Sequence, residues 1–291
     1  MVYSNRREDS YMLVTMKEIL ERAKKEGYGV TAPNVQSEDT ARAVIEVAES
    51  LNAPMIVDVN AFIHPDLPWF VGFIRELAEK ASVPIAINLD HGKTYHDIML
   101  GISSRFTSIM VDRSNLTYEE NVQETKEVVK MCHCLGITVE AELGHVGQGE
   151  NYEIDGVSNL TIPEEAASFI KETGVDCLAI AVGTAHGRYK GVPHIDFERL
   201  EAIAKACGDT PLVLHGGSGT GDENLAKAVR NGIQKVNLAT ELVVAGKENL
   251  EEFMKDSNFD KWKLMHAFIE GYKERLIHYV KLFGQENKAW K

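Results

Sequence analysis

Three histidines in this sequence occupy the same local context. His91, His186 and His215 each follow a short apolar run and each precedes a glycine. Three imidazoles that leave one coordination position open are the pattern of a catalytic zinc site. A lone histidine is more often an ordinary packing or surface residue, but the repeated context, with a glycine that allows close approach, predicts one Zn2+ ion held by all three.

Carboxylates stand beside these histidines. Asp90 directly precedes His91, where it could orient a metal ligand or act as a general acid–base; spacing alone leaves both roles open. Glu142 ends another apolar run, and Glu150 follows it within a loop that contains two spaced glycines. Such a loop suits a mobile lid that carries a carboxylate over a site, although an ordinary polar surface loop has the same composition.

A phosphate site is predicted next to the histidine at position 215. The segment HGGSGT contains Gly216 and Ser218 and leads into a helical pattern, and a later apolar run ends with Asn237 and Thr240. Loops after the last two strands of an α/β barrel, beside a helix N-terminus, commonly bind phosphate. Lys190 could add a positive charge there, or it could be a solvated loop lysine.

The elements that must position these residues alternate regularly. Short β-type runs are followed by amphipathic helical segments, a pattern that predicts parallel strands. The eight expected strands are Gly29–Asn34, Met55–Val59, Ile85–Leu89, Ser108–Asp112, Thr138–Leu143, Cys177–Val182, Leu212–Leu214 and Lys235–Leu238. The expected helices are Glu38–Leu51, Trp69–Ala81, Tyr118–Leu135, Pro163–Thr173, Asp196–Ala206 and Asp222–Asn231, with a leading helix Met16–Lys25 and a long C-terminal helical tail, Leu250–Phe283.

Eight such units predict an α/β fold, a (β/α)8 TIM barrel that forms a single domain over residues 1–291; an open doubly wound sheet is the alternative. Barrel enzymes place their chemistry at the C-terminal ends of the strands. Polar side chains lie at or just past the ends of different runs, which predicts one shared site. They are Asn34, Asn60, Asp90, His91, Asp112, Glu142, His186, His215 and Asn237.

The composition excludes several classes of function. The net charge of −13 argues against nucleic-acid binding, and no apolar run approaches the length that spans a membrane. An anionic substrate remains possible because backbone N–H groups can hold phosphate. The four cysteines, which show no disulfide-like spacing, fit a reducing, cytoplasmic setting.

Five segments resemble the class II fructose-bisphosphate aldolase family, which includes the tagatose-bisphosphate aldolases. They are LDHG at 89–92, VEAELG at 139–144, GTAHGRYKG at 183–191, PLVLHGGSG at 211–219 and KVNLATEL at 235–242. The resemblance extends from about Met16 to Gly284. It implies a (β/α)8 barrel, in agreement with the count of repeated units, and zinc-dependent, reversible cleavage of fructose 1,6-bisphosphate or a close ketose phosphate to dihydroxyacetone phosphate and an aldehyde.

The resemblance also implies a role for each matching residue. The three histidines match zinc ligands, Glu142 matches a carboxylate near the metal, and Asp90 matches the acid–base that moves the C4 hydroxyl proton. Glu150 matches the loop carboxylate that transfers a proton on the dihydroxyacetone phosphate half. The substrate and C1-phosphate group then comprises Asn34, Gly187, Lys190, Gly216, Ser218, Asn237 and Thr240. The family further implies a monovalent cation, Na+ or K+, beside the phosphate, and a homodimer or homotetramer.

The sequence departs from the family pattern at the far end of the substrate. Asn60 replaces a common serine, Asp112-Arg113-Ser114 replaces Asp-Gly/Ala-Ser, Asp260-Lys261-Trp262 replaces Asp-Pro-Arg, and Glu150-Asn151 replaces Glu-Asp. We therefore expect altered or weakened recognition of a distal phosphate, with Arg113 as a candidate substitute.

Four alternatives stay open at this point. Two keep the reaction, namely a tagatose-bisphosphate aldolase and an aldolase for another ketose phosphate. The others are a metal-dependent epimerase and a non-catalytic barrel that senses sugar phosphates. Retention of Asp90, Glu150 and the three histidines favours an enzyme, because a sensor needs no proton carriers.

Overall fold

A single parallel sheet forms the centre of the protein. The computed structural model describes residues 12–146, 160–185, 187 and 193–291, and the strands lie in the order β1-β8-β7-β6-β5-β4-β3-β2. Between the two end strands, Asn34 bridges to Asp58 and the Val35 N–H donates to the Asp58 carbonyl at 3.0 Å. The sheet is therefore a nearly closed (β/α)8 barrel, which confirms the predicted fold. The strands are β1 Val30–Pro33, β2 Met55–Asn60, β3 Ile85–Gly92, β4 Ser108–Val111, β5 Thr138–Leu143, β6 Cys177–Ile180, β7 Leu212–Leu214 and β8 Ile233–Leu238.

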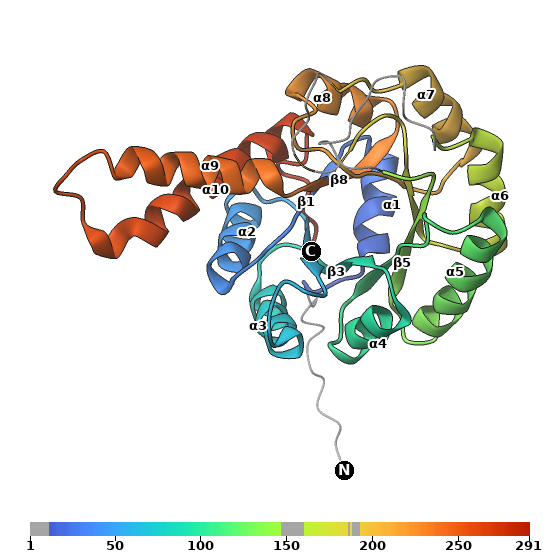
Figure 1. The fold of residues 1–291 in the computed structure, drawn as a ribbon, viewed down its shortest axis with the longest axis horizontal. Helices are drawn as coiled ribbons and strands as arrows, with labels where there is room; N and C mark the ends of the chain where they lie inside the picture. The colour runs from blue at the N-terminus through green and yellow to red at the C-terminus, as the bar shows by residue number, and fades with distance from the viewer. Residues whose placement is uncertain (1–11, 147–159, 186, 188–192) are drawn as a thin grey trace, which may run out of the picture.

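Helices surround this sheet (Figure 1). Several begin directly after a loop because a Ser or Thr side chain accepts an orphan backbone N–H of the first turn, as Ser37, Thr94 and Thr117 do. None of the described helices has the length and apolar character that crossing a bilayer demands. The helices are α1 Met16–Glu26, α2 Glu38–Ser50, α3 Leu67–Lys80, α4 Tyr95–Ser103, α5 Tyr118–His133, α6 Pro163–Thr173, α7 Phe197–Ala206, α8 Asp222–Arg230, α9 Thr240–Phe253 and α10 Leu264–Leu282, with a 3-10 turn, η2, at Lys261–Lys263.

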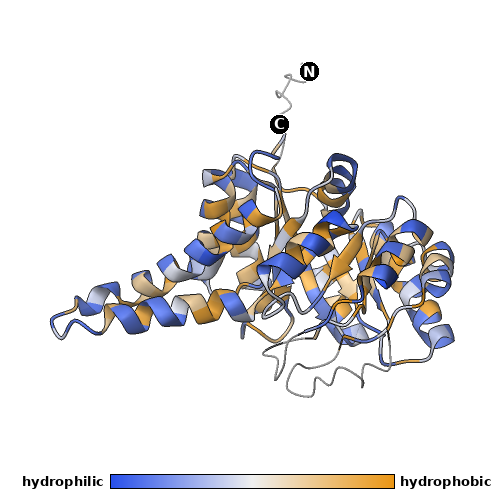
Figure 2. Cartoon of the chain, turned by 90° about the horizontal axis from the view of Figure 1, so that it is seen from above, coloured by the Kyte–Doolittle hydropathy of each residue, from blue (hydrophilic) through white to orange (hydrophobic). Residues whose placement is uncertain are grey.

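The predicted leading helix, α1, closes the N-terminal end of the barrel. Its Ile19 and Leu20 are fully buried and belong to the same cluster as inward-facing strand residues such as Ile56. At its start, the Met16 and Lys17 N–H groups donate to the hydroxyls that begin β4 and β5, at 3.0 and 3.2 Å. With this end plugged, the C-terminal ends of the strands are the end left for a site. Figure 2 shows the hydrophobic strands inside and hydrophilic residues on the outer helix faces.

The C-terminal tail differs from the prediction of one long helical tail. The chain forms a hairpin of two helices, α9 and α10, which projects from the barrel (Figure 1). The reversal occurs where Asp256 accepts the Asn258 N–H at 2.9 Å and Asp260 accepts the Trp262 N–H at 3.0 Å. Such hydrogen bonds from the backbone to Asp side chains compete with helical hydrogen bonds and end the helix. The apolar periodicity of the sequence does not show this break, because it continues on both sides of it.

Close packing in this hairpin yields a stability prediction. An added Cβ at Gly271 of α10 would lie 2.5 Å from the Ala245 carbonyl oxygen of α9. We expect Gly271→Ala to lower the free energy of unfolding by about 1–3 kcal/mol through overpacking. Gly72 is the matched control, because it is helical and nothing lies within 4 Å of its added Cβ. Gly72→Ala should raise stability by about 0.4–1 kcal/mol in chemical denaturation; equal effects of the two changes would contradict the close approach.

Candidate metal centre and active site

Asp90 and His91 reach the same cavity although they are neighbours in β3. In a regular strand, consecutive side chains point to opposite faces. Here the pairing with β4 shifts between Leu89 and Gly92, and His91 has a φ of 51°, a left-handed value that is uncommon for residues other than glycine. This irregularity turns both side chains toward the barrel mouth, where the His91 Nε2 lies 3.9 Å from an Asp90 carboxylate oxygen.

Two histidines present one nitrogen each to a common point. The His91 Nε2 faces the His215 Nδ1 at 3.2 Å. The other nitrogen of each ring is held by a carboxylate, since Asp112 lies 2.9 Å from the His91 Nδ1 and Glu140 lies 2.8 Å from the His215 Nε2. A carboxylate on the far ring nitrogen is the usual support of a metal-binding histidine, because it fixes the ring orientation and the tautomer.

Glu142 adds an oxygen to this group. Its side chain is buried, one oxygen accepts the Val146 N–H at 3.0 Å, and the other, Oε2, has no hydrogen-bond partner among the described residues. Ligand atoms of His91, Asp112 and Glu142 lie within 4.8 Å of one another, as do those of Asp90, His91 and His215.

The charges at this point favour a cation. Burial by itself would lower the pKa of His91, but Asp90, the hydrogen bond with Asp112, and Glu142 together raise it to about 9. Surrounding carboxylates that hold a proton there would equally favour a metal ion. Imidazole nitrogens with a carboxylate oxygen left unsatisfied are a donor set that suits a divalent transition metal such as zinc. The residues present therefore fit a metal.

Asp90 is held by three amides. Its Oδ2 accepts from Asn34 at 2.8 Å and from Asn60 at 3.1 Å, and its Oδ1 accepts from Asn237 at 3.2 Å. Burial alone would raise the pKa of Asp90; the neighbouring His91, His215 and a buried lysine, with the amide of Asn34, hold it well below its usual range. The carboxylate is thus ionised and fixed in position at the cavity wall.

The predicted phosphate residues that the structure describes line the same cavity as Asp90 and His91. Helix α9 begins at Thr240 with no side-chain cap from its N-cap residue, Ala239, and the Glu241 N–H donates to the Ser218 hydroxyl at 3.3 Å. Ser218 and the start of α9 thus lie together, and a helix N-terminus favours an anion. Gly216 has a φ of 68°, and a Cβ there would lie 2.3 Å from the Ala185 carbonyl oxygen, which explains the glycine. The residues of this part of the cavity are Gly187, Gly216, Gly217, Ser218, Ala239 and Thr240.

The opposite part of the cavity is built differently. The cavity has a volume of about 510 Å³ and continues to the loops after β2 and β3. There it is lined by the apolar side chains of Phe62, Ile63 and Leu100 and by Lys93 and His96. Phe62 is 83% exposed, an arrangement that leaves this apolar wall open to a ligand.

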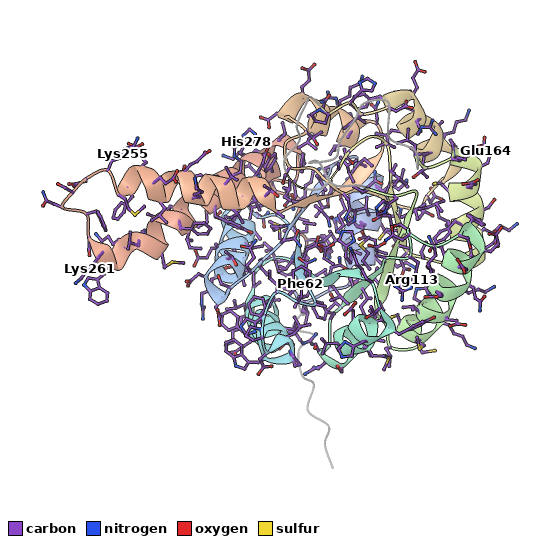
Figure 3. All side chains as sticks on the ribbon, in the orientation of Figure 1. Phe62, Arg113, Glu164, Lys255, Lys261 and His278 are labelled. Carbon is purple, nitrogen blue, oxygen red and sulfur yellow. The ribbon has the colours of Figure 1, made fainter. Side chains whose placement is uncertain are left out.

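Two residues that the sequence placed at the far end of the substrate do not lie in the cavity lining. Arg113 was the candidate substitute for phosphate binding, but its guanidinium donates to the Gly92 and Lys93 carbonyls at 2.9 and 2.8 Å and pairs with Glu124. It is buried and holds the β3–α4 loop, outside the cavity lining. The second position, Lys261, lies at the tip of the α9–α10 hairpin, away from the barrel (Figure 3).

The structure brings most of the predicted site together. Ten of the predicted residues lie at this cavity or contact its lining. They are Asn34, Asp90, His91, Glu142, Gly187, His215, Gly216, Ser218, Asn237 and Thr240. His186, Glu150 and Lys190 lie outside the described residues, so their predicted roles stay predictions.

The sequence reasoning missed one contributor and left two without a role. Glu140, within the VEAELG segment, was given no role, and Asn60 and Asp112 were noted as polar strand ends and as departures from the family pattern, without a contact assigned to either. The available signal was a charged residue inside an otherwise apolar strand, which is costly unless it is paired.

Comparisons with known proteins agree with this geometry. The family described as "Fructose-bisphosphate aldolase class-II" matches residues 14–288. The chain is 36% identical to a "Probable fructose-bisphosphate aldolase" of Bacillus subtilis strain 168, over 95% of this chain and 99% of that protein. It is 38% identical to a "Fructose-bisphosphate aldolase" of Thermus caldophilus, over 96% of this chain and 100% of that protein.

Among solved structures, the YdjI aldolase of Escherichia coli K12 superposes with a TM-score of 0.85 at 32% identity, covering 96% of this chain and 100% of that one. Sequence and structure thus agree over nearly the full length. The chain belongs to the class II fructose-bisphosphate aldolase family and is a carbon–carbon lyase of that family.

Proposed function

We propose that this protein is a zinc-dependent aldolase that reversibly cleaves a ketose phosphate into dihydroxyacetone phosphate and an aldehyde. One observation carries the proposal: the Asp90 carboxylate, fixed by three amides, lies beside two histidines, and the His91 Nε2 and the His215 Nδ1 face each other across 3.2 Å. A base and a metal-binding group at one cavity are the two components that a metal-assisted retro-aldol reaction requires.

In this proposal, His91, His215 and Glu142 hold the metal, and His186 completes the set. When bound, the zinc ion acts as a Lewis acid and stabilises the negative charge that develops on the dihydroxyacetone phosphate half. Asp90 accepts the proton of the C4 hydroxyl while the C3–C4 bond breaks, and the aldehyde leaves. Glu150 is the proposed proton carrier for the remaining half. In the reverse direction Asp90 returns its proton to the new hydroxyl.

The C1 phosphate is proposed to bind between the glycine loop after β7 and the start of α9. Gly187, Gly216, Ser218 and Thr240 are its proposed contacts, with Lys190 as a point charge and a monovalent cation beside it. The start of α9, where the Glu241 N–H lies 3.3 Å from the Ser218 hydroxyl, supports this assignment because a helix N-terminus favours an anion. Anchoring the phosphate holds the reacting carbons in register with Asp90, which is how an orientation effect contributes to rate. Asn34 and Asn237 are further proposed substrate contacts.

The distal end of the substrate is where this chain is proposed to differ from a fructose 1,6-bisphosphate aldolase. The cavity wall at that end has the apolar side chains of Phe62, Ile63 and Leu100 beside Lys93 and His96, and the described cavity lining contains no arginine to bind a phosphate in a bidentate way. Arg113, the arginine expected there, is used inside the protein. We therefore infer weak recognition of a second phosphate. Fructose 1,6-bisphosphate, tagatose 1,6-bisphosphate and another ketose phosphate all remain candidate substrates.

A substrate comparison tests this inference. Release of dihydroxyacetone phosphate from fructose 1,6-bisphosphate and from fructose 1-phosphate should give kcat/KM values within about tenfold, because a distal phosphate beside this apolar wall should stabilise the transition state by about 1.4 kcal/mol or less. A preference of several hundredfold for the bisphosphate would contradict weakened recognition. Release from none of a panel of ketose phosphates, with zinc present, would instead favour a sugar-phosphate sensor.

Three further properties follow as proposals from the family and the sequence. We propose a homo-oligomer, a dimer or a tetramer, which is supported by Trp262, a residue of the η2 turn between α9 and α10 that is 84% exposed. Cytoplasmic location is supported by the four cysteines, all of which are free. A single domain over residues 1–291 is supported by the continuous barrel.

A further inference from the structure

A charged group lies in the barrel core beneath the proposed metal site. Lys235 of β8, Glu140 of β5 and Asp58 of β2 have fully buried side chains. The Lys235 Nζ lies 2.8 Å from the Glu140 Oε2 and 3.5 Å from an Asp58 oxygen, whose other oxygen accepts from Asn88 at 2.9 Å. Glu140 also reaches His215, so a chain of polar contacts leads from the core to the cavity.

The chemistry of lysine determines which atom donates and which accepts in each of these hydrogen bonds. An ammonium group has three donors and no acceptor, so the Glu140 Oε2 must accept from Lys235. The Glu140 carboxylate is an acceptor on its other oxygen as well, and that oxygen lies 2.8 Å from the His215 Nε2. The imidazole must therefore carry its proton on Nε2. Its Nδ1, which faces His91, is left with the lone pair that a metal needs.

The pKa shifts of Glu140 and Lys235 agree with this assignment of donor and acceptor. Burial would raise the pKa of Glu140, but Lys235 and His215 hold it below its ordinary value. Burial would likewise lower the pKa of Lys235, and Asp58 and Glu140 raise it above its ordinary value. The two partners are therefore an ammonium and a carboxylate. A buried ion pair often adds little to the free energy of unfolding, because the cost of removing both charges from water offsets their attraction. A contribution to stability therefore does not explain why this pair contacts His215.

We infer that the Lys235–Glu140 pair sets the tautomer of His215 and thereby prepares its Nδ1 to bind the metal. Both are positioning residues: neither is part of the cavity lining, and Lys235 reaches His215 through its contact with Glu140. The inference rests on the proposed function in one respect, since it takes His215 as a metal ligand.

The substitution Glu140→Gln keeps the size of the side chain and changes which of its atoms can accept a hydrogen bond. The amide is nearly the same size as the carboxylate, but its carbonyl oxygen must face the Lys235 ammonium, which can only donate. Its NH2 group then faces the His215 Nε2 and makes that nitrogen an acceptor. The imidazole proton moves to Nδ1, where it blocks the metal. Zinc affinity, measured by competition with a chromophoric chelator, should fall about 10–100-fold.

A second substitution should reverse this loss. In Glu140→Gln combined with Lys235→Met, no ammonium competes for the amide oxygen, so the glutamine can turn its carbonyl toward the His215 Nε2–H. Zinc affinity should return to within about tenfold of the wild type, less than the loss that altering such a supporting group can cause. A merely structural role predicts the opposite, since two core substitutions should damage the site more than one.

Two controls accompany these variants. Asp58→Asn changes a group one contact further from His215 and leaves the Lys235–Glu140 contact in place, so zinc affinity should be unchanged. Circular dichroism and thermal unfolding of the metal-free proteins identify variants that do not fold. In folded, metal-free protein, 15N chemical shifts of the His215 ring should show the Nε2–H form in the wild type and the Nδ1–H form in Glu140→Gln.

The outcomes distinguish this inference from the proposed function. Wild-type zinc affinity in Glu140→Gln would overturn the inference, as would a double variant that binds zinc no better than Glu140→Gln. Both results leave the aldolase proposal standing. If the wild type itself binds no zinc and gains no activity from it, the proposed function fails, while the 15N shifts still report whether Glu140 sets the tautomer.

Discussion

Replacing His91 with alanine should remove the bound metal and lower turnover by about 1,000-fold or more. His91 presents its Nε2 to the point shared with His215 and is held there by Asp112. Without His91, the zinc ion loses one of its proposed ligands. Lewis-acid stabilisation contributes several kcal/mol to such a reaction, and each 1.4 kcal/mol corresponds to about tenfold in rate. Metal content by elemental analysis and steady-state turnover measure the two effects.

The matched control is His133→Ala. His133 also pairs with a carboxylate, Asp176, at 2.8 Å, but it lies at the exposed end of α5, away from the histidines of the cavity. That variant should keep its zinc and its turnover. For the wild type, a chelator should abolish activity and added zinc should restore it. A His91→Ala protein with full metal content and normal turnover would exclude this residue from the metal site.

Replacing Asp90 with alanine should lower turnover by about 10²–10⁴-fold, the usual contribution of a positioned acid–base, while zinc stays bound. The physical reason is the arrangement of Asn34, Asn60 and Asn237, whose amides fix the carboxylate and keep it ionised. The alanine variant keeps the histidines but has no group to accept the C4 hydroxyl proton. Turnover measured at saturating substrate, with zinc content determined on the same sample, checks both statements.

Asp97→Ala is the matched control for the loss of a carboxylate. Asp97 lines the same cavity, but it accepts the Thr94 N–H at 2.9 Å and so caps α4. Its loss should cost stability, about 0.5–2 kcal/mol for a cap, with little change in turnover. Asp90→Asn is a poor control, because an amide NH2 at this position would face other amide donors. Unchanged turnover in Asp90→Ala would remove Asp90 from its proposed role.

The barrel and most of its site could be predicted from sequence because their signals are local. Strand runs are short and apolar, caps such as Ser37 and Thr94 act within a single helical turn, and strand ends of a parallel barrel meet at one mouth. Position in the chain therefore predicts that Asp90, His91 and His215 converge. The zinc and phosphate roles came from the family resemblance combined with this placement.

Side-chain contacts between different strands of the barrel could not be predicted from local sequence patterns. The Lys235–Glu140 pair joins β8 to β5, and Asn60 reaches Asp90 from β2. The use of Arg113 depends on carbonyls of a loop 20 residues away, and the α9–α10 hairpin depends on glycine contacts between helices.

The sequence by itself thus determined the repeated β/α units, the end of the barrel that holds the chemistry, and the residue types available there. Only the tertiary structure decided which carboxylate supports each histidine, which amides hold Asp90, and whether the arginine near the cavity is available to a ligand. The physical reason is that side-chain partners are selected by distances and donor directions in the closed barrel, which local periodicity does not contain.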